Sequence, residues 1–346
     1  MHASSVAKVV LFIACTHASR DSPTSGAGEM SGRAQPLRAV YSDLDGTLVH
    51  FSQWFERHGV RVLLGEDGDN STRAIVENEA GERRECHVLP EATMGPGFVS
   101  LRTVELVAKL RARGCLFVII TAARKSTLLE RLPFLPRADV NVAECGTRIL
   151  WGERLDTEWA NSFVHISGPL ETDISPDLRP EPLWQLYRQM RDAGLKCDTR
   201  SYYGCFRVAA RGPGETALVE GFRAKLDPTL ISSNMNLGKY DFFPACCGKG
   251  NAVRYLQTKL GHTREQSAAL FDDDNDLPMA EQCARHLLPA LTSESIVEAV
   301  RAHPEWRVAT RCGQGVFAIE ELLEGLLLEA EAAGSRGERA AELQEA

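Results

Sequence analysis

The stretch Val40-Tyr41-Ser42-Asp43-Leu44-Asp45-Gly46-Thr47-Leu48-Val49 carries the strongest signal for the fold. Two carboxylates stand two residues apart, directly after a short apolar run and before a Gly-Thr turn signal. This order predicts a buried strand that delivers acids at its carboxyl end, where ligands bind in an open parallel α/β sheet. The turn at Gly46 allows the second carboxylate to turn away from the first, so one acid can attack while the other moves a proton. A solvated Asp-Gly turn is the alternative interpretation of this stretch taken alone.

Length and composition limit the classes of protein to consider. The chain has 346 residues, of which 44% are hydrophobic, so we expect one domain plus a substantial insertion or second domain. A net charge of −8 without a Lys/Arg block argues against nucleic acid or an anionic membrane as partner. A small phosphorylated molecule remains compatible, because its site needs only local positive charge. The ten cysteines are scattered without zinc spacing and indicate reduced residues in a reducing compartment.

The amino terminus permits two interpretations. Val6 to Cys15 is an apolar run with the length of a signal-peptide core, and it is too short to span a bilayer. Residues 19–35 are rich in Ser, Gly, Thr and Pro. We therefore expect residues 1–36 to be a flexible leader or a possible targeting segment. A cytoplasmic location is expected, and cleavage of a targeting peptide would make the location organellar or secreted instead. The sequence does not decide the oligomeric state.

A strand, a helix and a second strand follow one another in the first half of the chain. Apolar residues recur at helical spacing from Leu101 to Leu110, and the continuous apolar run Cys115 to Ile120 is typical of a strand buried on both faces. Together with the strand at Val40 they form a βαβ crossover, which predicts a parallel sheet. Residues 50–97 lie between these elements and are interpreted as a flap, with a hairpin turn at Asn78 to Arg84.

Thr121 ends the second buried strand, beside a helix expected over residues 126–132. A hydroxyl in this position can bind phosphate oxygens together with free backbone N–H groups. A simple helix cap is the alternative role for this threonine. A third strand is expected over Asp139 to Ala143.

The character of the chain changes from about Trp151 to Asp241. We expect strands over Phe163–Ile166 and Cys205–Ala209, and helices over Leu183–Ala193 and Thr216–Leu226. These segments predict a separate α/β module inserted into the sheet domain.

Lysine and acid signals appear after this module. Lys249 stands near the amino end of a helix and opposes its dipole, at a cost of about 0.3–1 kcal/mol unless an anion lies nearby. The run Asp272-Asp273-Asp274-Asn275-Asp276 follows a short apolar strand. Clustered carboxylates repel one another, so a hard divalent cation with oxygen ligands is expected, and Mg²⁺ suits such a site. An exposed acidic loop or a calcium loop is the alternative, although the EF-hand pattern is absent.

Taken in order, the acid pair, hydroxyl, lysine and acid cluster resemble the four motifs of the haloacid dehalogenase (HAD) superfamily, over Arg38 to about Leu327. The resemblance implies a doubly wound, Rossmann-like parallel sheet with an inserted α/β cap of the C2 type. Residues 37–150 and 242–328 would form the core, 151–241 the cap and 329–346 a polar tail. Several segments resemble the Cof-type branch, especially the sucrose-phosphate phosphatase-like group.

In that group the resemblance implies that Asp43 attacks phosphorus and also binds Mg²⁺. Asp45 would protonate the leaving oxygen and activate water, while its backbone carbonyl helps to bind the metal. Thr121 and Lys249 would hold the transferring phosphoryl group. The first acid of the cluster, Asp272, would be a direct metal ligand.

The remaining members of the acid cluster would support the same site. Asp273 and Asp276 would position waters on the metal, and Asn275 would contact the substrate phosphate. Specificity would lie in the cap, with candidate contacts at Arg124, Tyr202 and Tyr203.

Two departures from the family pattern concern the site. Thr121-Ala122-Ala123-Arg124 has one residue more than the usual Thr-Gly-Arg, so the alignment of the hydroxyl stays open, and Phe271 stands where the acid loop begins with Gly. The expected function is a Mg²⁺-dependent phosphatase acting on a small phosphorylated metabolite such as a sugar phosphate. A sugar phosphomutase, a non-catalytic HAD-fold protein and a receiver-like signalling module are the alternatives.

Overall fold

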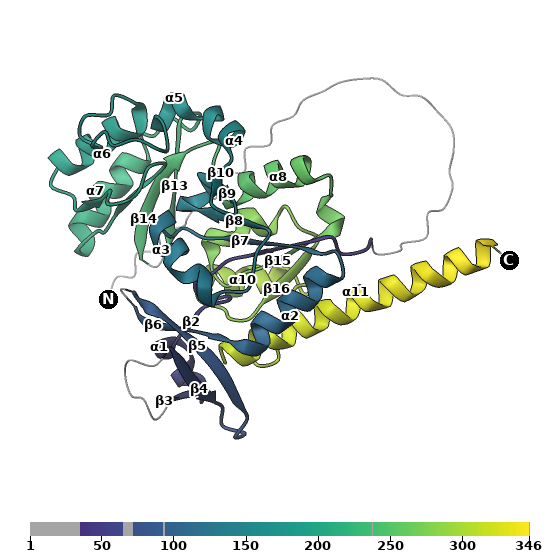
Figure 1. Cartoon of the computed structure of the whole chain (residues 1–346). Helices are drawn as coiled ribbons and strands as arrows, with labels where there is room; N and C mark the ends of the chain where they lie inside the picture. The colour runs from purple at the N-terminus through teal and green to yellow at the C-terminus, as the bar shows by residue number, and fades with distance from the viewer. Residues whose placement is uncertain (1–34, 65–71, 93, 237, 346) are drawn as a thin grey trace. The chain divides into compact units, whose positions relative to one another are not determined.

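An eight-stranded sheet organises the computed structural model, which describes residues 35–64, 72–92, 94–236 and 238–345 (Figure 1). The central strand β1 (Ala39–Ser42) pairs in parallel with β7 (Leu116–Ile120) on one side and β15 (Ser267–Leu270) on the other. All four residues of β1 are buried, which is the reason for its apolar sequence. The sheet order is β10-β9-β8-β7-β1-β15-β16-β17.

The outer strands continue this sheet on both sides. The parallel members are β8 (Val140–Ala143), β16 (Arg285–Leu288) and β17 (Arg307–Val308), and the antiparallel edge is formed by β9 (Arg148–Trp151) and β10 (Arg154–Leu155). The βαβ crossover and the parallel sheet predicted from the sequence are therefore confirmed.

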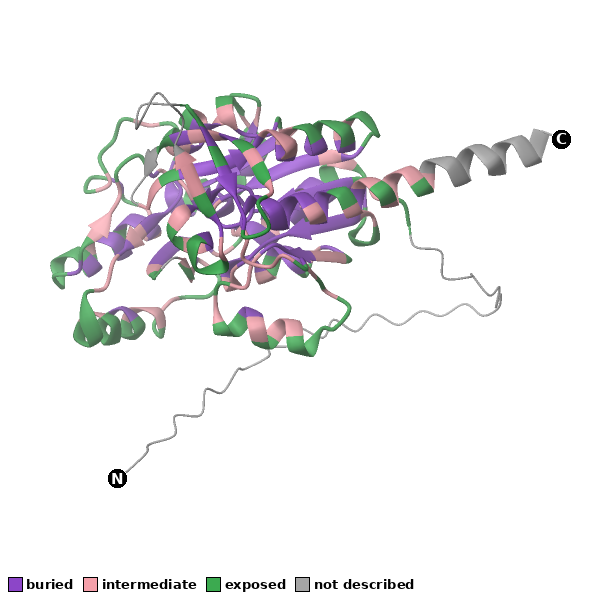
Figure 2. Cartoon of the chain, turned by 90° about the horizontal axis from the view of Figure 1, so that it is seen from below, coloured by how far each residue is buried: buried purple, intermediate pink, exposed green. Residues whose placement is uncertain are grey.

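Helices cover both faces of this sheet. On β7, Phe117 and Ile119 belong to a core shared with α2 (Leu101–Ala112) and α11 (Val316–Glu345). Their neighbours Val118 and Ile120 point to the other face and share a core with α8 (Lys249–Leu260). Side chains that alternate along the strand thus contribute to an apolar layer on each face of the sheet, as a doubly wound α/β fold requires. Figure 1 shows α2 and α11 running side by side, and Figure 2 shows buried residues gathered in the central strands.

Shorter helices complete the connections of the core. They are α3 (Lys125–Arg131), α9 (Leu277–Ala280) and α10 (Glu294–Ala302). Residues 329–345, expected as a polar tail, continue helix α11. Among the described residues, no helix combines the length and apolar character needed to cross a bilayer. The possible targeting segment falls within residues 1–34 and lies outside the described residues.

The segment expected as a flap is a second sheet of five antiparallel strands, in the order β2-β6-β5-β4-β3. The predicted hairpin is confirmed, because β4 (Arg73–Glu77) and β5 (Arg83–Ala92) pair across a turn at Asn78–Glu82. The other strands are β2 (His50–Phe51), β3 (Arg61–Leu64) and β6 (Gly95–Ser100), and the short helix α1 (Ser52–Phe55) follows β2.

A third sheet of four antiparallel strands lies in the segment expected as the inserted module, in the order β11-β12-β14-β13. Its strands are β11 (Cys197–Asp198), β12 (Phe206–Val208), β13 (Ile231–Asn236) and β14 (Lys239–Pro244). Four helices accompany it, namely α4 (Thr157–Ser162), α5 (Val164–Ser167), α6 (Pro182–Asp192) and α7 (Gly212–Arg223). The expected boundary at Asp241 falls inside β14, which continues to Pro244.

One secondary-structure prediction in this segment is wrong. Residues 163–166 were expected to form a strand, but Val164–Ser167 is helix α5. Phe163 and Ile166 are both buried, three residues apart, which is a helical spacing. A run of four residues is too short for its apolar pattern to separate the two periods. The predictions of strand β12 and helix α6 are confirmed, and α7 begins four residues before the expected Thr216.

Candidate active site

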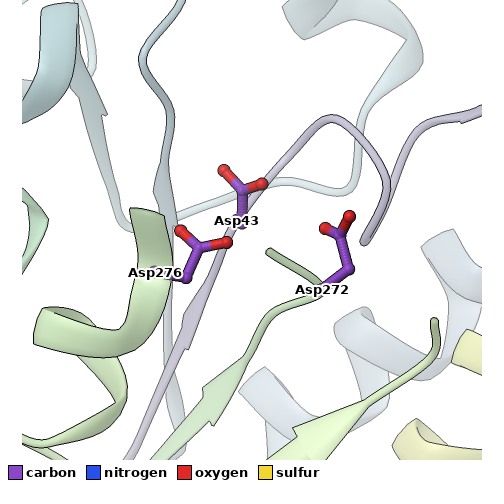
Figure 3. A group of neighbouring side chains, drawn as sticks. All are labelled: Asp43, Asp272 and Asp276. Carbon is purple, nitrogen blue, oxygen red and sulfur yellow. The ribbon is translucent and has the colours of Figure 1, made fainter. Parts of the chain in front are cut away.

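Three buried carboxylates meet at the carboxyl edge of the central sheet. Asp43 follows β1, Asp272 follows the neighbouring strand β15 within two residues, and Asp276 ends a short turn of 3-10 helix. One oxygen from each lies within 4.8 Å of the others. Figure 3 shows the three side chains as neighbours. Adjacent parallel strands end at the same edge of a sheet, so residues more than 220 positions apart in sequence come together here.

Lys249 supplies the positive charge of this group. Its Nζ donates to Asp43 Oδ1 at 2.6 Å and to Asp276 Oδ1 at 2.5 Å. Burial by itself favours the neutral amine, but Asp276 and Asp43 hold the pKa of Lys249 above its usual range. The position of Lys249 at the amino end of helix α8 is unfavourable unless an anion lies nearby. Two anionic partners, Asp43 and Asp276, lie there.

The carboxylates respond to burial in the opposite direction. Burial, with the nearby charge of Asp276, raises the pKa of Asp43 to about 8, although Lys249 lowers it. Burial also raises the pKa of Asp272, and the charges of Asp43 and Asp276 add to that effect. One ammonium group thus faces three buried acids, so the cluster of Lys249 and the three acids has too little positive charge to neutralise three carboxylates.

The donor atoms of this group fit a hard cation such as Mg²⁺. Asp276 Oδ2 and the neighbouring Asn275 Oδ1 are buried and accept no hydrogen bond from any part of the chain that the structure describes. Carboxylate and amide oxygens are the ligands that Mg²⁺ prefers. Asp273 lies on the wall of the adjoining cavity, and its Oδ1 accepts from the backbone N–H of Asp274.

The carboxylate of Asp45 lies apart from the three acids. Its Oδ1 accepts from Arg131 Nη1 at 2.7 Å, and the guanidinium of Arg131 is almost fully buried on helix α3. The turn that follows Asp45 needs glycine at 46, where φ is +101° and a Cβ would lie 2.2 Å from Asp272 Oδ2. The sequence predicted that Asp45 turns away but did not identify Arg131 as its partner, because a single arginine on a helix carries no signal for this role.

Thr47 is a second residue that sequence reasoning missed. Its hydroxyl donates to Asp272 Oδ1 at 2.7 Å and so orients the acid that follows β15. The turn signal Gly46-Thr47 was visible in the sequence, but it was interpreted only as a turn.

A cavity of about 840 Å³ opens onto the acids. Asp43, Asp45, Lys249, Asp272, Asp273 and Asn275 all line it, as does Thr121. The hydroxyl oxygen of Thr121 accepts from the N–H of Ala123 at 3.1 Å, whereas the N-cap of α3 is Arg124. Thr121 is therefore not the cap of this helix, and it lines the same cavity as Asp43 and Lys249.

The third sheet contributes the opposite side of the cavity. Arg124 forms an ion pair with Asp198, and its Cζ lies 4.8 Å from the ring centroid of Tyr202. These three residues line the cavity. Tyr203, a candidate specificity residue, does not line it.

The position of Tyr203 has a structural explanation. Its ring lies against Arg148 and Arg179, and its N–H donates to Glu144 Oε2 at 2.8 Å. Glu144 also accepts from Gly204 N–H at 3.0 Å and forms a salt bridge with Arg148. The sequence did not reveal that these residues join the end of β8 to the segment that precedes β12.

Comparisons with known proteins identify the fold of this chain. No protein-family model matches the chain, and no curated protein sequence matches it either. Solved structures do match. The sucrose-phosphatase of Synechocystis sp. PCC6803, solved with sucrose and phosphate, aligns over 84% of this chain and 99% of its own, with a TM-score of 0.55 and 16% identity.

Two further structures agree. BT1666 of Bacteroides thetaiotaomicron, described as a phosphatase of the HAD superfamily, covers 88% of this chain and 99% of its own, with a TM-score of 0.52 and 12% identity. Protein 0175 of Thermoplasma acidophilum covers 84% and 99%, with a TM-score of 0.54 and 12% identity. The fold of this chain is therefore the HAD fold, and the resemblance found in the sequence motifs is confirmed for the fold.

Proposed function

We propose that this chain is a Mg²⁺-dependent phosphoric monoester hydrolase that works through an aspartyl-phosphate on Asp43. The observation that carries the proposal is the buried group of Asp43, Lys249, Asp272 and Asp276, which opens into a cavity of about 840 Å³. A buried acid that lines a cavity and contacts a buried lysine is poised for attack on a phosphorylated ligand.

In the first step, an oxygen of Asp43 attacks phosphorus and the bond from phosphorus to the ester oxygen breaks. Asp45 donates its proton to the departing oxygen. In the second step, Asp45 takes a proton from water and the water oxygen attacks phosphorus. The bond between phosphorus and the Asp43 oxygen breaks, which frees the Asp43 carboxylate and inorganic phosphate. Lys249 reduces the repulsion between Asp43 and the phosphoryl group, and Thr121 donates a hydrogen bond to a phosphoryl oxygen.

The metal would be held by Asp43, Asp272, Asp276 and the backbone carbonyl of Asp45, with Asp273 and Asn275 nearby. When bound, Mg²⁺ supplies charge that stabilises the transferring phosphoryl group. The role of Arg131 in this scheme is to position Asp45, because its guanidinium contacts the carboxylate directly.

Residues 151–241 act in this proposal as a C2-type cap that selects the substrate through Tyr202, and Arg124 of the core contacts the substrate from the other side of the cavity. A sugar phosphate is the proposed substrate class. Its support is the similarity to the sucrose-phosphatase that was solved with sucrose and phosphate. A cytoplasmic location remains a prediction.

The direct test measures inorganic phosphate released from p-nitrophenyl phosphate and a panel of sugar phosphates, with Mg²⁺ and after chelation. We expect turnover that chelation abolishes and added Mg²⁺ restores. Asp43→Asn removes the nucleophile and should reduce turnover to background. Asp173→Asn, an exposed acid away from the cavity, is the matched control. Turnover that survives chelation, or production of an isomeric sugar phosphate without release of phosphate, would overturn the proposal.

A further inference from the structure

One face of the third sheet forms the far wall of the cavity, and the strand register arranges its polar residues in rows. In the first row, Asp198 on β11 lies opposite Arg207 on β12, and Arg207 lies opposite Asp241 on β14. Because side chains alternate along a strand, the residues on either side of Arg207 face the other way and are buried. The row therefore belongs to the face that lines the cavity.

A second row lies one step further along the same face. The N–H of Ala209 donates to the backbone oxygen of Lys196 at 3.2 Å, and Asn236 on β13 pairs with Lys239 on β14. Val208 pairs with Tyr240, so the same register continued by one residue sets Ala209 opposite Lys239. The second row thus reads Lys196, Ala209, Lys239 and Asn236, and all four residues line the cavity.

The spacing of this row suits a small anion. Neighbouring strands lie about 4.8 Å apart, so the two lysines start about 10 Å apart, one on each side of Ala209. The small side chain of Ala209 leaves room between them. The two long lysine side chains can therefore converge on one group in front of the alanine.

The charges of the two rows differ. In the first row the cationic residue, Arg207, already has a carboxylate partner, because it donates two hydrogen bonds of 2.6 and 2.7 Å to Asp241. Asp198 is shared by Arg124 and Arg200. In the second row, neither lysine pairs with a carboxylate of the described residues. This wall therefore carries more positive than negative charge, although the chain as a whole is acidic.

We propose that the second row is a subsite for an additional anionic group, so that the substrate carries a phosphate or carboxylate besides the phosphate that is cleaved. The proposal rests on the proposed phosphatase function and narrows its substrate class. Unpaired ammonium groups attract an anion strongly in a partly enclosed site. A neutral hydroxyl-rich group would leave both lysines without a charged partner.

The test compares kcat/KM for four substrates, namely a hexose monophosphate whose sugar is uncharged, a hexose bisphosphate, a phosphorylated sugar acid and p-nitrophenyl phosphate. We expect the bisphosphate, the sugar acid phosphate or both to exceed the hexose monophosphate by at least about tenfold, the worth of one charged hydrogen bond. A preference for one of the two substrates that carry an additional anionic group identifies that group as phosphate or as carboxylate.

Substitutions of the two lysines then test whether the second row causes this substrate preference. Lys196→Met and Lys239→Met keep the apolar stem but remove the charge. Each should lower the ratio of kcat/KM for the substrate with the additional anionic group over the hexose monophosphate by about tenfold or more. Lys225→Met, an exposed lysine of the same segment outside the cavity, is the matched control and should keep the wild-type ratio. A preference for the hexose monophosphate, or a ratio insensitive to both cavity variants, would overturn the inference.

A binding measurement separates this inference from the phosphatase proposal. Calorimetric titration of Asp43→Asn with the same bisphosphate, with and without the two lysine substitutions, reports the subsite even if no substrate is hydrolysed. We expect the affinity for the bisphosphate to fall with each substitution more than the affinity for the monophosphate. Equal losses for both ligands would contradict the subsite, whereas absence of turnover on every substrate would contradict only the phosphatase function.

Discussion

Asp45→Asn is the substitution that tests most directly the separate roles of the two acids at the end of β1. The carboxylate of Asp45 contacts Arg131, whereas Asp43 contacts Lys249, so the change leaves the nucleophile and its partner intact. The amide oxygen of asparagine can still accept from the buried Arg131 Nη1. We therefore expect the variant to fold like the wild type and to lose only its proton transfer.

The size of the loss depends on the leaving group. General acid–base assistance is worth roughly 10²–10⁴-fold, or about 3–5 kcal/mol of barrier. Nitrophenolate leaves with little protonic help, so phosphorylation of Asp43 by p-nitrophenyl phosphate should remain fast. Hydrolysis of the resulting aspartyl-phosphate still needs a base and should be slow. A burst of one nitrophenolate per active site is expected, followed by slow turnover.

Rapid-quench kinetics and intact-mass measurement distinguish the outcomes. Asp45→Asn should gain the mass of one phosphoryl group, and that group should map to Asp43. Asp43→Asn should show neither a burst nor a covalent adduct. Wild-type turnover by Asp45→Asn would refute the assignment of Asp45 as acid and base. An adduct on any other residue would refute the assignment of Asp43 as nucleophile.

Three further predictions concern the acid group itself. Lys249→Met leaves Asp43 without its buried partner and should lower the free energy of unfolding by about 3–5 kcal/mol, measured by denaturant titration without Mg²⁺. Gly46→Ala drives a Cβ against the Asp272 carboxylate and should abolish Mg²⁺ binding measured calorimetrically, whereas Gly81→Ala, also at positive φ but with open space around it, should retain binding. In metal-free protein the raised pKa of Asp43 means that the folded state holds its proton more tightly. The contribution of this proton to stability is then full below 3.8, the usual pKa of an aspartate, and is lost as pH rises toward about 8. Asp43→Asn should therefore show a flatter decline of unfolding free energy over that window. An equal slope in wild type and variant would contradict this assignment of the pH dependence.

The elements that the sequence predicted well are those with a continuous apolar run or a long periodic pattern of apolar residues. The continuous run Cys115 to Ile120 could only be a strand buried on both faces, and helix α6 was recognised from its periodic apolar residues. The short segment at Val164 was misassigned, because four residues satisfy either period. The flap was recognised as a hairpin, but its five-stranded sheet depends on pairings between β2, β5 and β6 that no local pattern encodes.

The sequence by itself indicated the chemistry of the candidate site, because acids, a hydroxyl and a lysine stand at strand ends or helix starts. Clustered acids, and a lysine at the start of a helix, are unfavourable there unless a ligand or a partner of opposite charge is present. Only the tertiary structure decided which of them meet. Strand order brings Asp272 beside Asp43, and helix α3 brings Arg131 to Asp45, because packing of distant elements sets those distances. Strand register likewise places Lys196 and Lys239 on one face of the cavity, since pairing between strands, rather than spacing within one, decides which side chains are neighbours.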